Sequence, residues 1–159
     1  MNKKIARPLL ALACLGLASA ASAQLKPEEM IKFRQSGYTF MAWNMGKIKA
    51  MAVDDKVPFD AKQVASAANV VAAVANSGLG ALFAPGTDNG KGWKETRLKS
   101  EFFEKPDEVK EVALNFVKQA NELQRVAAGG DKAAIKAQFG ETGKACKACH
   151  DKFREEEDK

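Results

Sequence analysis

The sequence contains very few of the residues that usually build catalytic or metal sites. It has one histidine, one tyrosine and three cysteines in 159 residues. A chain with a single histidine cannot supply two imidazole ligands to one metal ion. Without Cys14, which lies in the predicted signal peptide described below, two cysteines and one histidine fall short of the four ligands of a structural zinc site. It also has no run of about 20 apolar residues, so no segment is predicted to span a bilayer.

The first 23 residues have the three-part layout of a secretory signal peptide. A positively charged start, an apolar stretch and a small-residue cleavage site, Ala21-Ser22-Ala23, follow one another. We therefore predict that residues 1–23 are removed and that residues 24–159 form one exported, periplasmic domain. Cys14 would leave with the signal peptide, although a lipoprotein site at this cysteine is an alternative.

The overall positive charge does not indicate a nucleic-acid-binding protein. Part of the formal charge of +5 belongs to the signal peptide, which carries lysine and arginine but no acidic residue. The remaining lysines and glutamates alternate along the chain, as on the solvated faces of helices. We draw no inference of nucleic-acid binding from this balance.

The first predicted helix begins after Pro27 and ends at Val57-Pro58. It carries two neighbouring apolar stripes, which suggests one contact with the core and one with a partner subunit. The core stripe consists of Ile31, Arg34, Tyr38, Met41, Met45, Ile48 and Ala52. The second stripe consists of Met30, Phe33, Phe40 and Met51.

Three further helices follow, and no segment alternates as a strand would. Asp60 and Asp131 are the predicted N-caps of the second and fourth helices, and the third begins at Pro106 or Asp107. Residues 79–106 form a long connection rich in glycine and proline. The pattern predicts an all-α protein, an antiparallel four-helix bundle with one long crossover loop.

The strongest chemical signal is the segment Cys146-Lys147-Ala148-Cys149-His150. On a helix, residues spaced by three and four positions share a face, so two thiols and an imidazole project together. This pattern marks covalent haem c attachment, in which Cys146 and Cys149 bond the porphyrin and His150 binds the iron. A disulfide or a thioredoxin-like pair would leave the adjacent histidine or the lack of an upstream strand unexplained.

The ligand on the other side of the iron has to be a residue other than histidine, or no protein residue at all. The methionines of the first helix are candidates, although methionine at helical spacing is usually core filling. Tyr38 is a further candidate as a phenolate, but a reference pKa near 10 makes that form scarce at neutral pH. Tyr38 could instead pack in the core with its hydroxyl reaching solvent.

The whole mature chain resembles the cytochrome c′ family. The segments that carry this resemblance are Lys26-Pro27-Glu28, Phe33-Arg34-Gln35-Ser36, Val57-Pro58-Phe59-Asp60-Ala61, Phe83-Ala84-Pro85-Gly86-Thr87, Thr96-Arg97, Glu101-Phe102 and Gly140-Glu141-Thr142-Gly143 with the haem motif near the carboxyl end. The resemblance implies a five-coordinate, high-spin haem that binds NO and CO, and a homodimer formed through the first helix.

The resemblance also implies roles for individual residues around the haem. Low-spin relatives place a methionine ligand four residues after the arginine of an Arg-Gln pair, where this chain has Tyr38. The open side of the iron is therefore expected to lie beneath the tyrosine ring, which would admit a diatomic gas. Other residues implied to lie around the haem are Arg34 and Gln35 near the propionates, Glu95 and Thr96 at the edge, and Arg154 beside the proximal imidazole.

Two other functions remain open at this level. A low-spin electron carrier would use Met41 or Met45 as the axial ligand. A peroxidase-like enzyme would need a distal histidine or another acid–base residue, for which the sequence offers no obvious candidate. We therefore expect a gas-binding haem protein that can transfer electrons and is not an enzyme, with an unidentified redox partner.

Overall fold

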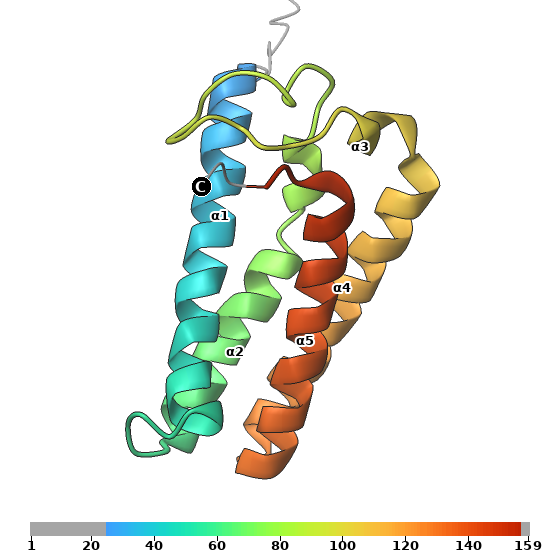
Figure 1. Ribbon diagram of the computed structural model, residues 1–159. Helices are drawn as coiled ribbons and strands as arrows, with labels where there is room; N and C mark the ends of the chain where they lie inside the picture. The colour runs from blue at the N-terminus through green and yellow to red at the C-terminus, as the bar shows by residue number, and fades with distance from the viewer. Residues whose placement is uncertain (1–24, 157–159) are drawn as a thin grey trace, which may run out of the picture.

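The computed structural model describes residues 25–156, which form four long helices packed antiparallel to one another (Figure 1). The long helices are α1 (Pro27–Ile48), α2 (Ala61–Ala75), α4 (Pro106–Ala128) and α5 (Lys132–Phe153). The predicted all-α, four-helix bundle is thus confirmed. The predicted signal peptide, residues 1–23, lies outside the described part of the chain.

The predicted helix starts are confirmed in detail. The Asp60 carboxylate accepts hydrogen bonds from the backbone N–H groups of Lys62 and Gln63, at 2.9 and 3.1 Å. Asp131 accepts two equivalent bonds at the start of α5. These carboxylates satisfy N–H groups that have no partner within the helix and lie at the positive end of its dipole.

The end of the first helix differs from the prediction. α1 ends at Ile48 and continues as a π-helical turn, η1 (Lys49–Val53), so regular helix does not extend to Val57-Pro58. The wider turn buries the adjacent residues Met51 and Ala52 together. Asp54 then ends the element, and its carboxylate accepts a 2.9 Å bond from Lys49.

The crossover between α2 and α4, described from the sequence as a long connection rich in glycine and proline, has short elements of its own. It contains a 3₁₀ turn, η2 (Leu79–Leu82), and a short helix, α3 (Glu101–Glu104). η2 follows Gly78, whose φ of +80° is a conformation that glycine adopts without strain. The crossover passes over the end of the bundle where α1 begins and α5 finishes (Figure 1).

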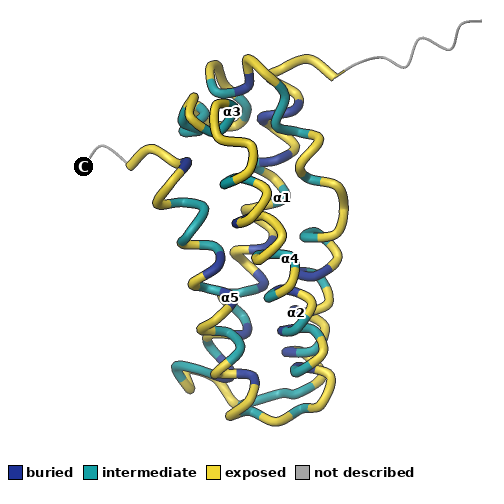
Figure 2. The backbone as a smooth tube through the Cα atoms, turned by 90° about the vertical axis from the view of Figure 1, so that its right-hand side faces the viewer, coloured by how far each residue is buried: buried dark blue, intermediate teal, exposed yellow. Residues whose placement is uncertain are grey.

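The packing pairs are α4 with α5, α2 with α4, and α1 with α2. α5 meets the first helical segment mainly through η1, at the opposite end of the bundle from the crossover. That end holds a buried apolar cluster of Ile48, Met51, Ala52, Val64, Ala67, Ala68, Leu123, Ala127 and Ile135. Figure 2 shows the buried positions recurring along the inward faces of the helices. Within residues 25–156, no helix has both the length and the apolarity to cross a membrane.

Candidate cofactor site

Helix α5 carries two free thiols and an imidazole close to its carboxyl end. Cys146 and Cys149 are half-buried, and neither is in a disulfide. Burial raises the pKa of both thiols, and the Cys149 sulfur raises that of Cys146 further. Both side chains are therefore neutral thiols at neutral pH, three residues apart on one helical face.

His150 is held in its neutral form. Burial lowers the pKa of this imidazole first, and the nearby cation of Arg154 lowers it further, against the opposing effect of Asp151. Neutral imidazole is the form that binds a metal ion. The three side chains together thus offer two groups for covalent attachment and one ligand for iron.

Tyr38 of α1 is the side chain that faces these thiols across the bundle. The residue is 40% exposed, although it lies on the stripe predicted to face the core. Burial of the hydroxyl raises its pKa to about 12, and the sulfurs of Cys149 and Cys146 add to that increase. Their electrostatic effect places the phenol near the attachment cysteines, and its pKa keeps it protonated at neutral pH.

A cluster of aromatic rings continues from Tyr38 to the end of α5. Tyr38 meets Phe83 edge to face, with ring centroids 6.4 Å apart, and Phe83 stacks on Phe102 at 4.8 Å. Phe102 in turn contacts Phe153, the last residue of α5, at 5.6 Å. These rings form an apolar surface between Tyr38 and the end of α5, which suits the flat, apolar body of a porphyrin.

Arg34 joins α1 to the crossover. The residue is only 4% exposed, and its guanidinium lies 4.7 Å from the centre of the Phe83 ring. Its NH1 donates to Thr87 Oγ1 at 2.7 Å and to the Leu82 carbonyl at 3.2 Å. Its NH2 donates to the Thr87 carbonyl at 2.5 Å and to Thr96 Oγ1 at 2.7 Å. The terminal donors of Arg34 thus hold the crossover, and a contact with a haem propionate stays a prediction.

Gln35 fixes a second part of the crossover. Its Nε2 donates to the Lys94 carbonyl at 2.9 Å, and its Oε1 accepts the Trp93 N–H at 2.8 Å. Gly92 packs so closely that an added Cβ would lie 2.7 Å from both Gln35 Oε1 and the Lys32 backbone nitrogen. Only glycine allows the loop to approach α1 to this distance. Gln35 therefore acts here as a clamp on the loop, and its expected place beside the propionates is untested.

The other residues predicted to lie around the haem differ in the contacts they make. Thr96 accepts from Arg34, whereas Glu95 is exposed and its backbone pairs with Lys91. Arg154 does not lie on the helical face of His150, because α5 ends at Phe153 and Arg154 is extended. Its charge still acts on His150 and on Cys149, lowering the pKa of each.

The methionines proposed as alternative iron ligands pack in the core. Met41 is buried against Val71 and Ala120, between α1, α2 and α4. Met45 packs against both buried clusters. The α1 side chain whose electrostatic contacts reach the attachment cysteines is Tyr38. Met41 and Met45 thus make their contacts within the core, whereas Tyr38 interacts with the two cysteines.

Two residues that organise the site had no role assigned from sequence. Thr87 is completely buried, where its hydroxyl accepts from Arg34 and donates to the Ala84 carbonyl at 2.8 Å. Phe83 links the arginine to the tyrosine. Both residues belong to the Phe83-Ala84-Pro85-Gly86-Thr87 segment, which carries part of the family resemblance, but the resemblance gave neither residue a role. A loop contact with a buried arginine has no periodicity by which it could be found.

Comparison with known proteins gives consistent matches over this whole region. The cytochrome c′ family model matches residues 29–154. A cytochrome c′ of Allochromatium vinosum is 51% identical over 155 residues, covering 97% of this chain and 99% of that protein. A solved cytochrome c′ with an unusual ligand-controlled dimer dissociation is 52% identical, has a TM-score of 0.79, and is matched over 84% of this chain and 100% of its own.

More distant structures with bound gases also match. A ferrous variant of cytochrome c′ from Alcaligenes xylosoxidans with bound NO is 30% identical with a TM-score of 0.74, matched over 84% of this chain and 99% of its own. A carbon monoxide complex of another variant of that protein is 31% identical with a TM-score of 0.73, matched over 82% of this chain and 98% of its own.

Proposed function

The chain belongs to the cytochrome c′ family, whose members bind covalent haem c, and we propose that it is a periplasmic, gas-binding haem protein. In this proposal Cys146 and Cys149 hold the haem through two thioether bonds, and His150 is the one protein ligand of the iron. When bound, the haem supplies an iron centre that takes a diatomic ligand and exchanges single electrons. We assign it no enzymatic turnover.

The observation that carries the proposal is the arrangement of α5 opposite Tyr38. Two free thiols and a neutral imidazole share one face, and the aromatic cluster beside them is apolar. Each thiol can add across a haem vinyl group, with its sulfur forming the thioether bond and its hydrogen going to the other vinyl carbon. The residues present therefore fit haem c.

Tyr38 supports a five-coordinate iron. Its pKa of about 12 makes phenolate, the form that would bind ferric iron, scarce at neutral pH. The protonated phenol can exclude water and larger ligands by its bulk, and its O–H can donate a hydrogen bond to a bound gas. The NO and CO complexes of the Alcaligenes xylosoxidans protein support the same ligand class for this chain.

The exposed aromatic residues of α1 support a homodimer. Phe33 and Phe40, from the second predicted stripe, are 51% and 49% exposed in the single chain. Trp43 stacks on Phe40 with ring centroids 5.6 Å apart. An apolar face of this kind favours association with a second copy. Phe40→Glu should convert a dimer to a monomer in sedimentation velocity, and an unchanged sedimentation coefficient would contradict this interface.

One set of measurements tests the haem proposal. The intact mass of the exported protein should equal residues 24–159 plus one haem, and the ferrous absorption spectrum should be high-spin until NO is added. A mass without haem would reject the attachment site. Sharp low-spin bands without added ligand would reject the open iron, and their loss in Met41→Ala or Met45→Ala would identify the electron-carrier alternative. Rapid peroxide turnover would reject the non-enzymatic role.

A further inference from the structure

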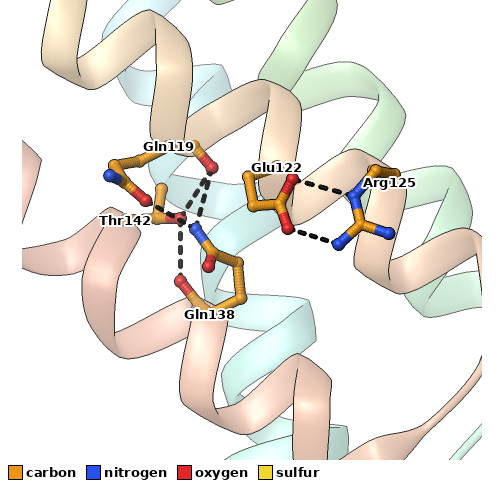
Figure 3. A network of polar contacts seen from close by, with 5 residues as sticks. All are labelled: Gln119, Glu122, Arg125, Gln138 and Thr142. Atoms are coloured by element: carbon orange, nitrogen blue, oxygen red, sulfur yellow. Dashed lines mark hydrogen bonds and ion pairs between the residues drawn. The ribbon is translucent and has the colours of Figure 1, made fainter.

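A partly buried polar network joins α4 to α5 one helical turn before Cys146 (Figure 3). Thr142 is completely buried and lies four residues before Cys146, on the same side of α5. Its Oγ1 lies 2.9 Å from the Gln138 carbonyl of its own helix and 3.2 Å from the Gln119 carbonyl of α4. The hydroxyl thus bridges the two helices.

The glutamines complete the network. Gln138 Nε2 donates to Gln119 Oε1 at 2.8 Å and approaches the Gln119 carbonyl at 3.3 Å. The Gln119 amide is oriented in turn by Asn115, because its Nε2 lies 3.4 Å from Asn115 Oδ1. Because hydrogen bonds require alignment of donor and acceptor, these contacts form at only one axial position of α5 relative to α4.

The apolar contacts between the same helices are less selective. Leu123 and Ala127 of α4 pack with Ile135 of α5 in the buried cluster. Such contacts are non-directional, so they constrain the axial position of one helix on the other less sharply than hydrogen bonds do. The neighbouring Glu122–Arg125 pair, also drawn in Figure 3, bonds within α4 and places no constraint on α5. Another directed side-chain contact between these helices is the Lys152–Glu108 ion pair at 2.9 Å, whose side chains are 45% and 46% exposed, so its contribution is small. Register between the helices therefore depends mainly on the three network residues.

The position of α5 at the cofactor site depends strongly on α4. These two helices form the most extensive packing pair, whereas α5 contacts the first helical segment mainly through η1, at the far end. A shift of α5 by one residue would move its side chains by about 1.5 Å along the axis. Such a shift would change the height of His150 relative to Tyr38.

We propose that the Thr142–Gln119–Gln138 network is a positioning device that sets the axial register of α5, and through it the position from which the His150 imidazole would hold the iron. The proposal rests on the proposed function, because it takes haem at Cys146 and Cys149 as given. None of the three residues needs to touch the haem. They act through the one helical turn that separates Thr142 from Cys146.

The test compares four haem-loaded proteins: the unchanged chain, Thr142→Val, Thr142→Ser and Ile135→Val. Valine keeps the shape of threonine and removes the hydroxyl, whereas serine keeps the hydroxyl. Ile135→Val loosens the same interface, at an equally buried position of α5, without touching a polar group. The readouts are the iron–imidazole stretching band in resonance Raman spectra of the ferrous protein and the hyperfine-shifted haem methyl signals in NMR.

We expect Thr142→Val to shift the iron–imidazole band and the methyl signals, and Thr142→Ser and Ile135→Val to leave both close to those of the unchanged chain. An unchanged band in Thr142→Val would overturn the proposal, as would an equal shift in Ile135→Val, which would indicate general loosening. If Thr142→Val yields no folded protein, Gln138→Met is judged by the same criteria. Failure of haem attachment in the unchanged chain would instead reject the proposed function.

Discussion

The two ends of the bundle are held together by different kinds of contact. At the end formed by η1 and the start of α5, buried apolar side chains such as Ile48, Leu123 and Ile135 pack in one cluster. At the other end, the crossover is held by hydrogen bonds from Arg34 and Gln35 and by stacked aromatic rings. One end is closed by non-directional packing, and the other is shaped by directed contacts.

This difference assigns a different role to each end: the apolar end contributes mainly stability, and the other end positions the residues of the site. Apolar packing contributes in proportion to buried area and tolerates small displacements. Directed hydrogen bonds hold atoms at defined positions but contribute modestly to net stability. The thiols, the imidazole and Tyr38 all lie toward the end with directed contacts. We therefore expect variants at the apolar end to change stability alone, and variants at the other end to change the haem environment.

The largest effect is expected from removing both attachment cysteines. In Cys146→Ser/Cys149→Ser neither thioether bond can form, so the purified protein should lose covalent haem completely. The intact mass under denaturing conditions measures this directly. Cys14→Ser is the matched control, because this cysteine belongs to the predicted signal peptide, and it should leave the haem content unchanged. Covalent haem in the double variant would contradict the assignment of the site.

The next largest effect is expected at the apolar end. Leu123→Ala removes a completely buried side chain from the main cluster and should lower the free energy of unfolding by about 2–5 kcal/mol. Chemical denaturation monitored by circular dichroism measures the loss. The ferrous and NO-bound spectra should stay as they were, since the cavity lies away from the thiols. A change in the ferrous or NO-bound spectrum of Leu123→Ala as large as that caused by a substitution at the site itself would show that the two ends are coupled.

A smaller loss of stability is expected where Thr87 meets Arg34. Thr87→Val leaves a buried guanidinium donor without its acceptor and should cost about 1.5–3 kcal/mol. Here, unlike at the apolar end, we also expect altered NO association, because Arg34 and Phe83 adjoin Tyr38. Thr87→Ser keeps the hydroxyl and is the control. If stopped-flow measurements give the same rate of NO binding for the unchanged chain, Thr87→Val and Thr87→Ser, then Arg34 does not help to organise the site.

The apolar end could be predicted almost completely from the sequence. Helical spacing identified Ile48 and Ala52 as core residues, and the caps at Asp60 and Asp131 were recognised from residue type. Both signals are local and repeat along the chain. The π turn at Lys49–Val53 was missed, because one additional residue in a turn changes backbone hydrogen bonds without an evident change in the apolar pattern.

At the other end, the site could be predicted only where its residues follow one another closely in the sequence. The Cys146–His150 motif predicted attachment, whereas the contacts of Arg34 with Thr87 and Thr96 join residues more than fifty positions apart. Such pairs follow no periodicity, and the stripe rule predicted Arg34 as a core position without saying what it binds. The extended conformation of Arg154 could not be predicted for a related reason, because the sequence does not mark the last residue of α5.

The smallest effect is expected for the ionisation of Tyr38, which lies toward the end of the bundle with directed contacts. Since this is the only tyrosine in the chain, its ionisation can be followed by ultraviolet absorbance without interference from another phenol. We expect titration near its raised pKa of about 12 rather than at the ordinary pKa of tyrosine, 10.0, mainly because of burial. The folded state then retains a proton that the unfolded state has lost, so stability is fully present below the lower pKa and falls as pH rises through the higher one. The Tyr38→Phe variant should lack this contribution to the loss of folding stability at alkaline pH. Ionisation at the ordinary pKa would mean that solvent reaches the hydroxyl freely, and the ring would then not shield the iron as proposed.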